Sequence, residues 1–406
     1  MNFRTIIFPI SSLFFAIGFL AIGYGMILTF VGIYLKELQV SNIVIGLINA
    51  SFFLGAISSS IFSQKIISTV GHIRSFGAFA SIMVISFLLH SLFFDEYLWA
   101  FLRFTSGFSF YGLLIILESW LNEKSDEKDR GKILAIYTIV FYLATAIGQL
   151  FLNISEDFKQ SIFSIGSILV LFSIIFIALT KIKEPHLKPF EQYSFPKIFS
   201  VAPLATVTSF IGGFFVGGFF TMIPVYLMNQ FDSIEMVSYF MLIALLGGLV
   251  SQWPIGLLSD KFGRRKLIAY ASLSTVFTSL LFILYPNNQF LTYFFAFLLG
   301  LTIFCLYPLS LARANDVIDE NKDIVEISRT LLFTYGVGSF ISPILIGIGL
   351  SFFNWFLFGA FFLFGTFLYF YALSQERVSD EDMSVFVNVP VASGAELPKL
   401  DPRQDD

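Results

Sequence analysis

Twelve runs of apolar residues, separated by short polar connections, restrict the fold of this 406-residue chain more than any other feature. The first run, at about 8–35, contains no acid or base and is longer than the apolar core of a signal peptide, so we interpret it as an uncleaved span. A helix needs about 20 apolar residues to cross a bilayer. The other runs lie at about 43–63, 76–94, 97–121, 133–154, 161–180, 200–229, 236–258, 267–285, 289–312, 330–350 and 352–374.

The composition agrees with a chain that is embedded in a lipid bilayer. Only 13% of the residues are charged and 56% are hydrophobic, so a soluble domain of this length would lack the polar surface to cover itself. Twelve spans leave room for short connections and one tail. The sequence therefore predicts an all-α membrane protein with twelve transmembrane helices in the lipid bilayer and no sizeable soluble domain.

The positions of the basic residues predict the orientation. An even number of spans puts both termini on one side of the membrane. That side carries 21 Lys and Arg residues and the opposite side carries two, with Arg103 inside a span. Because cytoplasmic loops carry the excess of basic residues, we expect both termini in the cytoplasm.

The longest internal connection, 181–199, contains three prolines and several charges and is typical of a linker. It divides the chain into an N-terminal six-helix half at 1–180 and a C-terminal six-helix half at 200–374. The tail at 375–406 carries eight acidic and three basic residues without helical apolar periodicity. We expect this acidic cytoplasmic tail to be disordered.

Several classes of function lack support in the sequence. Cys305 is the only cysteine, and the three histidines fall in separate segments, so we expect neither a metal site nor a cofactor. No nucleotide-binding loop and no Ser/His/Asp arrangement is present, so we do not expect an enzyme. The membrane part is nearly neutral, and we expect a monomer without a nucleic-acid partner.

The two predicted halves are related by an internal repeat. A shift of 192 residues aligns Gly25 with Gly217, Thr29 with Thr221, Tyr34-Leu35 with Tyr226-Leu227, Gly55 with Gly247 and Gly71 with Gly263. The register holds without a gap over two spans and the loop after them. Parallel repeats of this kind build transporters in which the substrate site lies between the halves near the bilayer midplane.

One polar loop occurs twice under this shift. The second loop, Gly256–Lys266, reads GLLSDKFGRRK and contains one acid and four bases. The first loop, Gln64–Arg74, has Ser68 where the second has Asp260. The second copy is therefore intact, whereas the first has lost its acid.

The second loop resembles the signature G-x-x-x-D-x-x-G-R-[RK] of the major facilitator superfamily, which stands between spans 2 and 3 and between spans 8 and 9. More narrowly, the chain before the tail is similar to the YcaD-like subfamily of bacterial inner-membrane transporters. This resemblance implies a two-domain helical transporter, the major facilitator fold, in a bacterial inner membrane. The residues that carry it are Glu118-Ser119, Arg130-Gly131, Gly148-Gln149-Leu150, Gln252-Trp253-Pro254-Ile255-Gly256 and Leu306-Tyr307-Pro308.

The resemblance also implies a latch made by the loop between Gly256 and Gly263 and the residues after it. Asp260 would approach the start of span 5 near Arg130-Gly131, and Arg264 would reach Asp316 at the cytoplasmic end of span 10. Contacts of this type at helix ends contribute about 0.3–1 kcal/mol each. In the first half the latch is expected to be weaker or made differently, with Arg74 and Glu118 as one pairing. A solvated basic loop that only fixes topology is the alternative, and it is our preferred interpretation for Arg265 and Lys266.

Two charged residues inside the spans are candidates for coupling. Arg103 precedes Gly107 by four residues, which resembles the span-4 pattern R-x-x-x-G of the superfamily; alternatively it snorkels to the headgroups. Glu118 is the only acid within the apolar spans and the single candidate for a proton-binding carboxylate. Its position near the cytoplasmic end leaves a structural ion pair as an equal alternative.

Polar residues at suitable depth are candidates for the substrate pocket, although each tyrosine taken singly is better explained as a packed aromatic residue. A lining of this kind suits an uncharged, zwitterionic or amphipathic solute. The seven candidates are Tyr24, Asn49, Tyr111, Tyr142, Gln149, Tyr307 and Tyr335.

The repeat and the intact loop together predict a secondary active transporter of a small solute, working by alternating access. Proton coupling stays an open option, because no acid lies at the midplane. The alternatives are a transporter-derived sensor, which would need a large folded cytoplasmic domain, and a lipid translocator, which would need a polar lateral opening between spans.

Overall fold

The structure is a computed structural model that describes residues 3–123, 130–154, 161–179, 202–317, 324–376 and 378. Within this part the chain is helical, without strands, and twelve helices are long and apolar enough to cross a membrane. The prediction of an all-α protein with twelve spans is thereby confirmed. The linker predicted at 181–199 and nearly all of the tail predicted at 375–406 lie outside the described residues.

Six spans form the first half of the molecule and six the second. In the first half α5 is followed by a short 3-10 turn, η1. The helices of the first half are α1 (Phe3–Glu37), α2 (Asn42–Val70), α3 (His72–Leu92), α4 (Glu96–Glu123), α5 (Arg130–Leu150), η1 (Phe151–Asn153) and α6 (Ser161–Ala178). Those of the second half are α8 (Pro203–Thr221), α9 (Ile223–Phe231), α10 (Ile234–Phe262), α11 (Arg264–Leu284), α12 (Gln289–Ile303), α13 (Leu306–Val317), α14 (Ile324–Leu350) and α15 (Phe356–Ser374).

Two spans of the second half each involve a second helix. The seventh span, α8, is followed after one residue by the short helix α9, and the tenth span consists of α12 and α13. Pro224 and Pro308 lie near the start of the second piece in each case. Proline lacks an N–H and is tolerated in the first turn of a helix, so it favours a new helix at these points over continuation of the old one.

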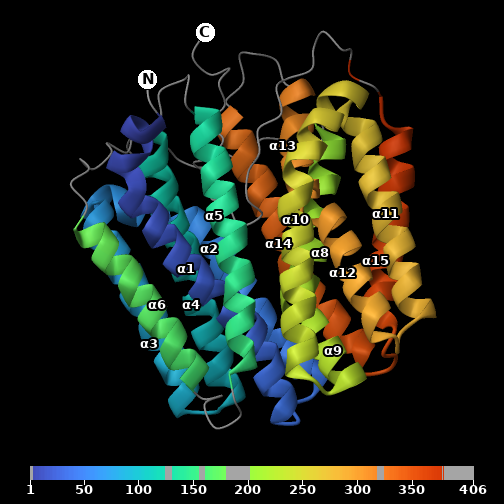
Figure 1. Cartoon of the computed structure of the whole chain (residues 1–406), viewed down its shortest axis with the longest axis horizontal. Helices are drawn as coiled ribbons and strands as arrows, with labels where there is room; N and C mark the ends of the chain where they lie inside the picture. The colour runs from blue at the N-terminus through green and yellow to red at the C-terminus, as the bar shows by residue number, and fades with distance from the viewer. Residues whose placement is uncertain are drawn as a thin grey trace.

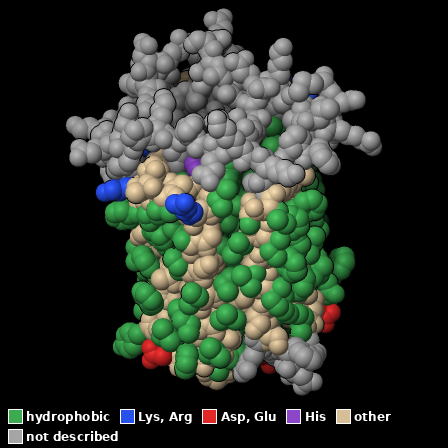
Figure 2. Space-filling model, turned by 90° about the vertical axis from the view of Figure 1, so that its left-hand side faces the viewer, with side chains coloured by type: hydrophobic (Ala, Val, Ile, Leu, Met, Phe, Trp, Pro, Cys, Tyr) green, Lys and Arg blue, Asp and Glu red, His purple; other side chains and the backbone are tan. Residues whose placement is uncertain are grey.

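Figure 1 shows the two halves side by side, with α1 beginning and α15 ending at the same end of the bundle. We call this the terminal end, and the opposite one the far end. Apolar side chains cover the middle of the face in Figure 2, with Lys and Arg near the terminal end and Asp and Glu at the far end. An uncovered apolar belt between polar ends is typical of a helix bundle surrounded by lipid.

The internal repeat is visible in how the helices pack. A Cβ added to Gly107 would lie 1.9 Å from the carbonyl oxygen of Phe52, where α4 crosses α2. A Cβ added to Gly300 would lie 1.9 Å from the carbonyl oxygen of Ala244, where α12 crosses α10. Phe52 and Ala244 are 192 residues apart. In each half, a glycine therefore lets the backbones of two equivalent helices approach each other closely.

The halves meet mainly through α2 against α14 and α5 against α10. At the far end, Asn42 Nδ2 donates to the Leu350 carbonyl (3.1 Å) and Ser238 Oγ donates to the Gln149 carbonyl (2.7 Å). At the terminal end, Arg329 Nη2 donates to Gln64 Oε1 (2.7 Å). The halves are thus in contact on both sides of the region between them.

Candidate functional site

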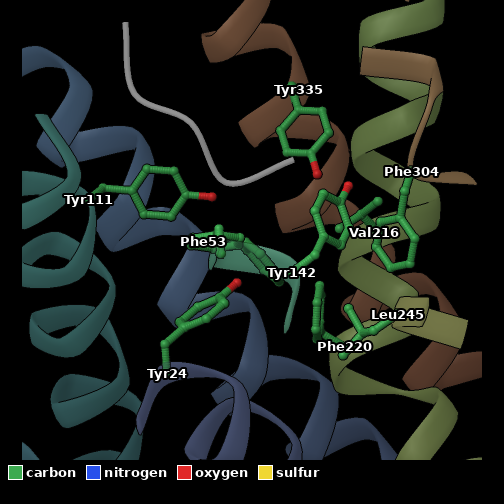
Figure 3. Close-up of a pocket in the computed structure, with 10 residues that line it drawn as sticks. Tyr24, Phe53, Tyr111, Tyr142, Val216, Phe220, Leu245, Phe304 and Tyr335 are labelled. Carbon is green, nitrogen blue, oxygen red and sulfur yellow. The ribbon is translucent and has the colours of Figure 1, made fainter. Parts of the chain in front are cut away.

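A narrow cavity lies between the two halves, in the middle of the bundle (Figure 3). Its free volume of ≈ 10 Å³ is about that needed for one water molecule. The hydroxyl groups of Tyr24, Tyr111 and Tyr335 point toward its centre. Its lining consists of Tyr24, Phe53, Tyr111, Phe141, Tyr142, Val216, Phe220, Leu245, Phe304 and Tyr335.

Most of these lining residues form pairs related by the repeat. With a shift of 192 or 193 residues, Tyr24 pairs with Val216, Phe53 with Leu245, Tyr111 with Phe304 and Tyr142 with Tyr335. Equivalent turns of equivalent helices therefore enclose the cavity from both sides. In three of the four pairs the second half supplies a residue without a polar atom, so the first half is the more polar wall.

Four of the seven residues predicted for the pocket line the cavity: Tyr24, Tyr111, Tyr142 and Tyr335. The other three are buried but do not line it. Asn49 accepts a hydrogen bond from Arg103, Gln149 donates to the Gly25 carbonyl (2.9 Å), and Tyr307 packs behind Tyr335 with ring centroids 4.9 Å apart.

The apolar lining residues were missed by sequence reasoning, which considered polar groups alone. The internal repeat in the sequence could have identified some of these apolar residues. The repeat shift applied to Tyr24 and Tyr111 leads directly to Val216 and Phe304. Tyr142 also connects the halves, because Gln252 Nε2 on α10 donates to its hydroxyl (3.3 Å).

Arg103 lies inside the bundle and is only 1% exposed, so the snorkelling alternative does not describe it. Its Nη2 donates to Asn49 Oδ1 (3.2 Å), and its guanidinium carbon lies 4.7 Å above the centre of the Phe52 ring. The depth of Arg103 along its helix follows from its position in the apolar run, whereas the direction of its side chain depends on how α4 packs against α2.

Glu118 is fully buried near the terminal end of α4, and its Oε1 accepts a hydrogen bond from the Tyr137 hydroxyl (3.0 Å). Arg74 is exposed, and no bond between Arg74 and Glu118 is present. The structure therefore does not make the pairing that we expected for the first half. Among the described residues no group of three His, Cys, Asp or Glu side chains is placed to hold a metal.

The second loop forms a compact cluster around Arg264, whose side chain is 1% exposed. Its Nη1 donates to Ser259 Oγ and to Asp260 Oδ1, both at 2.6 Å, and its Nε lies 3.5 Å from Asp316 Oδ2 on α13. Gly263 joins α10 to α11 with φ 84°, a conformation that favours glycine. Arg264, Asp260 and Asp316 are thus together, whereas Gly256 lies one turn before them in α10.

Two further arginines hold the end of the last helix. Arg265 Nη1 donates to the Gln375 carbonyl (2.7 Å), and Arg313 Nη2 donates to the Glu376 carbonyl (2.9 Å). These carbonyls follow α15 and have no partner within a helix, so cations suit them. Arg265, which we interpreted as part of a solvated loop, thus has a specific structural contact. The approach of Asp260 to the start of span 5 near Arg130-Gly131 stays a prediction, because residues 124–129 and the side chain of Arg130 lie outside the described part.

The first loop uses the same backbone with different side chains. Gly71 joins α2 to α3 with φ 94°, and His72 after it is buried. His72 Nε2 makes a hydrogen bond with Ser119 Oγ on α4 (2.9 Å). Gln64, at the start of the loop, contacts Arg329 of the other half.

Comparison with known proteins identifies the family of this chain. The model of the Major Facilitator Superfamily matches residues 13–325 and 233–393. MFS-type transporter YcaD of Escherichia coli O6:K15:H31 (strain 536 / UPEC) is 25% identical over 337 residues, which cover 82% of this chain and 87% of that protein. Among solved structures, nucleoside transporter NupG superposes with a TM-score of 0.72 at 14% identity and covers 90% of this chain and 98% of its own.

A second solved structure shares the fold. A bacterial homologue of the human lysosomal transporter Spinster, in an inward-facing and unoccupied conformation, has a TM-score of 0.67 at 13% identity and covers 100% of this chain and 98% of its own. At such identities these likenesses show the fold alone, whereas the family model spans most of the chain. The protein therefore belongs to the major facilitator superfamily and is a multi-pass membrane transporter.

Proposed function

We propose that the protein is a secondary active transporter that moves a small solute by alternating access. The observation that carries this proposal is the central cavity, whose walls are repeat-related residues from the two halves. A solute bound there would contact both halves at equivalent depth, so rocking of one half against the other would expose it first to one side and then to the other. The hydroxyl of Tyr335 is buried without a hydrogen-bond partner among the described residues, which suits it to a polar atom of a solute.

The contacts between the halves are suited to making and breaking. In the part of the chain that the structure describes, hydrogen bonds such as those from Asn42 to Leu350 and from Arg329 to Gln64 connect the halves at their two ends. A typical hydrogen bond contributes about 0.5–1.5 kcal/mol net. Opening one end therefore costs an amount that a ligand or an ion gradient can supply.

The orientation and the compartment are part of the proposal. The excess of Lys and Arg on the side of the termini supports a cytoplasmic terminal end in a bacterial inner membrane. The same reasoning makes the cluster of Asp260, Arg264 and Asp316 a cytoplasmic latch, and the far end periplasmic. We propose a monomer as the working unit, since the cavity is formed within one chain.

Alternating access can be tested without knowing the solute. In a Cys305→Ala background, spin labels at Tyr97 and Gln289 report on the far end, and labels at Lys65 and Lys261 report on the terminal end. We expect two distance populations at each end in lipid nanodiscs, with the wide population at one end matching the narrow one at the other. One fixed distance at both ends, under every pH and every ligand of a metabolite panel, contradicts the proposal.

Glu118 is our candidate for proton coupling, with Arg103 as the second charged residue inside the spans. Glu118 is buried and bonded to Tyr137, so a change in its protonation would alter the packing of α4 on α5. In proteoliposomes, Glu118→Gln should abolish the dependence of solute uptake on a pH gradient while leaving exchange down the solute gradient. Transport that responds to pH as before removes Glu118 from this role.

A further inference from the structure

The strongest unexplained feature of the molecule is the buried charge of Arg103. A guanidinium has five N–H donors. In this structure one of them is bonded, from Nη2 to Asn49 Oδ1, and the Nε–H has no acceptor among the described residues. Asn49 Nδ2, beside Arg103, is a second buried donor that has no acceptor among the described residues. Two adjacent side chains thus present donors and a positive charge without enough acceptors.

No carboxylate of the described chain neutralises this charge. The ion pairs among described residues involve Arg264 and not Arg103. Glu118, the acid on the same helix, is 15 residues further along, which is about 22 Å. Ionisable groups inside a membrane are costly and usually pair with a counter-charge, so an arginine without one points to a partner from outside the chain.

The internal repeat shows that the fold does not need this charge. Asn49 on α2 corresponds to Met241 on α10, and Arg103 on α4 corresponds to Ala296 on α12. Met241 and Ala296 are both fully buried, and α10 crosses α12 with the same close glycine contact as α2 and α4. The same helix crossing is therefore built in the second half from apolar residues alone.

Arg103 does not line the central cavity but lies one side chain behind its wall, separated from the lining residue Tyr24 by Phe52. Its guanidinium covers one face of Phe52, and the ring of Tyr24, which lines the cavity, is 6.1 Å from the same Phe52 ring. These contacts belong to the first half, which is the more polar wall of the cavity.

We propose that Arg103, with Asn49 beside it, is the docking site for a carboxylate of the transported solute, which makes the substrate class an organic carboxylate with an apolar or aromatic body. A carboxylate supplies the acceptors that Arg103 Nε and Asn49 Nδ2 lack, and it matches the planar guanidinium in a bidentate pair. The body of the solute would lie among the aromatic residues that line the cavity, such as Phe220 and Phe304. This assignment rests on the proposed function, because it concerns the same cavity.

The test compares matched probes on the purified full-length protein in nanodiscs. The probes are 3-phenylpropanoate and indole-3-acetate, each with its neutral amide, and binding is measured as the concentration-dependent rise in melting temperature. We expect at least one carboxylate to bind with a Kd at least tenfold lower than its amide. Arg103→Met should remove that difference between acid and amide.

Two variants separate docking from a structural role. Asn49→Asp places a carboxylate of the protein next to Arg103, so it should abolish the preference for the carboxylate probe, whereas the same change at the exposed Asn153 should leave it intact. Arg103→Met should also raise the melting temperature of the ligand-free protein, because an apolar side chain replaces a buried charge. A purely structural arginine would lower it.

Three results overturn the assignment: amides that bind as tightly as carboxylates, a panel in which no carboxylate shifts the melting temperature, or an Asn49→Asp variant that keeps the acid preference. None of these three results contradicts the proposed transport function. If a neutral solute accumulates in proteoliposomes along a gradient, transport stands and the carboxylate site is wrong. If the labelled ends of the molecule never move, alternating access is wrong, whatever the probes show.

Discussion

The two copies of the loop between the second and third spans of each half share a backbone but not a chemistry. Gly71 has φ 94° and ψ 161°, and Gly263 has φ 84° and ψ 148°. Each glycine ends one helix and starts the next. After the turn, however, the first copy has His72, which makes a hydrogen bond with Ser119, whereas the second copy has Arg264 in a buried ion pair.

This difference separates the part of the duplicated loop that both copies share from the part that only the second copy has. The glycine turn is kept in both copies, so it is needed to reverse the chain at the membrane surface. The ion pair is kept in one copy only. The first loop has no acid and contacts the other half through the neutral side chain of Gln64, which accepts a hydrogen bond from Arg329.

The largest expected effect is on the buried ion pair. Arg264→Ala removes the buried cation that lies 3.5 Å from the Asp316 carboxylate, and breaking such a pair costs about 3–5 kcal/mol. His72→Ala removes the hydrogen bond to Ser119, worth about 1 kcal/mol, together with a buried ring, whereas Ser119 Oγ keeps its bond to the Ile116 carbonyl, so we expect a smaller loss than for Arg264→Ala. The free energy of unfolding, measured by titration from mild detergent into SDS, should separate the two variants clearly.

The double replacement of this pair is the control. Arg264→Met together with Asp316→Leu removes both charges, so it should destabilise the protein less than Arg264→Ala alone. Equal losses for His72→Ala and Arg264→Ala would remove the distinction between the two loops.

The second largest expected effect is the loss of stability on replacing a turn glycine, and it should be the same in both loops. Alanine at Gly71 or at Gly263 would be forced into a backbone region that is almost restricted to glycine, at a cost of about 1–3 kcal/mol. Gly77, inside α3, has no heavy atom within 4 Å of an added Cβ and provides the control. Gly77→Ala should stabilise the protein by about 0.5–1 kcal/mol. If only one of the two turn glycines tolerated alanine, the loops would differ in backbone as well.

The sequence predicted the spans and the repeat, because these depend on apolar length and register, and the resemblance of the second loop to the superfamily signature implied the approach of Arg264 to Asp316. It did not predict which side of a helix faces the cavity. Tyr335 and Tyr307 were assigned similar depth, yet only Tyr335 lines the cavity. All sides of these helices are apolar, since lipid and core have the same polarity, so amphipathic periodicity gives no direction.

Contacts between the halves could not be predicted from the sequence either. A change in one of them should give the smallest shift that we predict in the balance between open and closed states. Gln64→Glu turns the hydrogen bond from Arg329 into a partly exposed ion pair, worth about 0.2–1 kcal/mol more. The equilibrium should shift by at most about fivefold toward the state with a closed terminal end, which the label pair at Lys65 and Lys261 reports as a larger short-distance population. Ser68→Asp restores the lost acid at an exposed position that bonds only to the Lys65 carbonyl, so it should shift the distances less. A larger shift from Ser68→Asp would mean that the missing acid, and not Gln64, sets the weakness of the first loop.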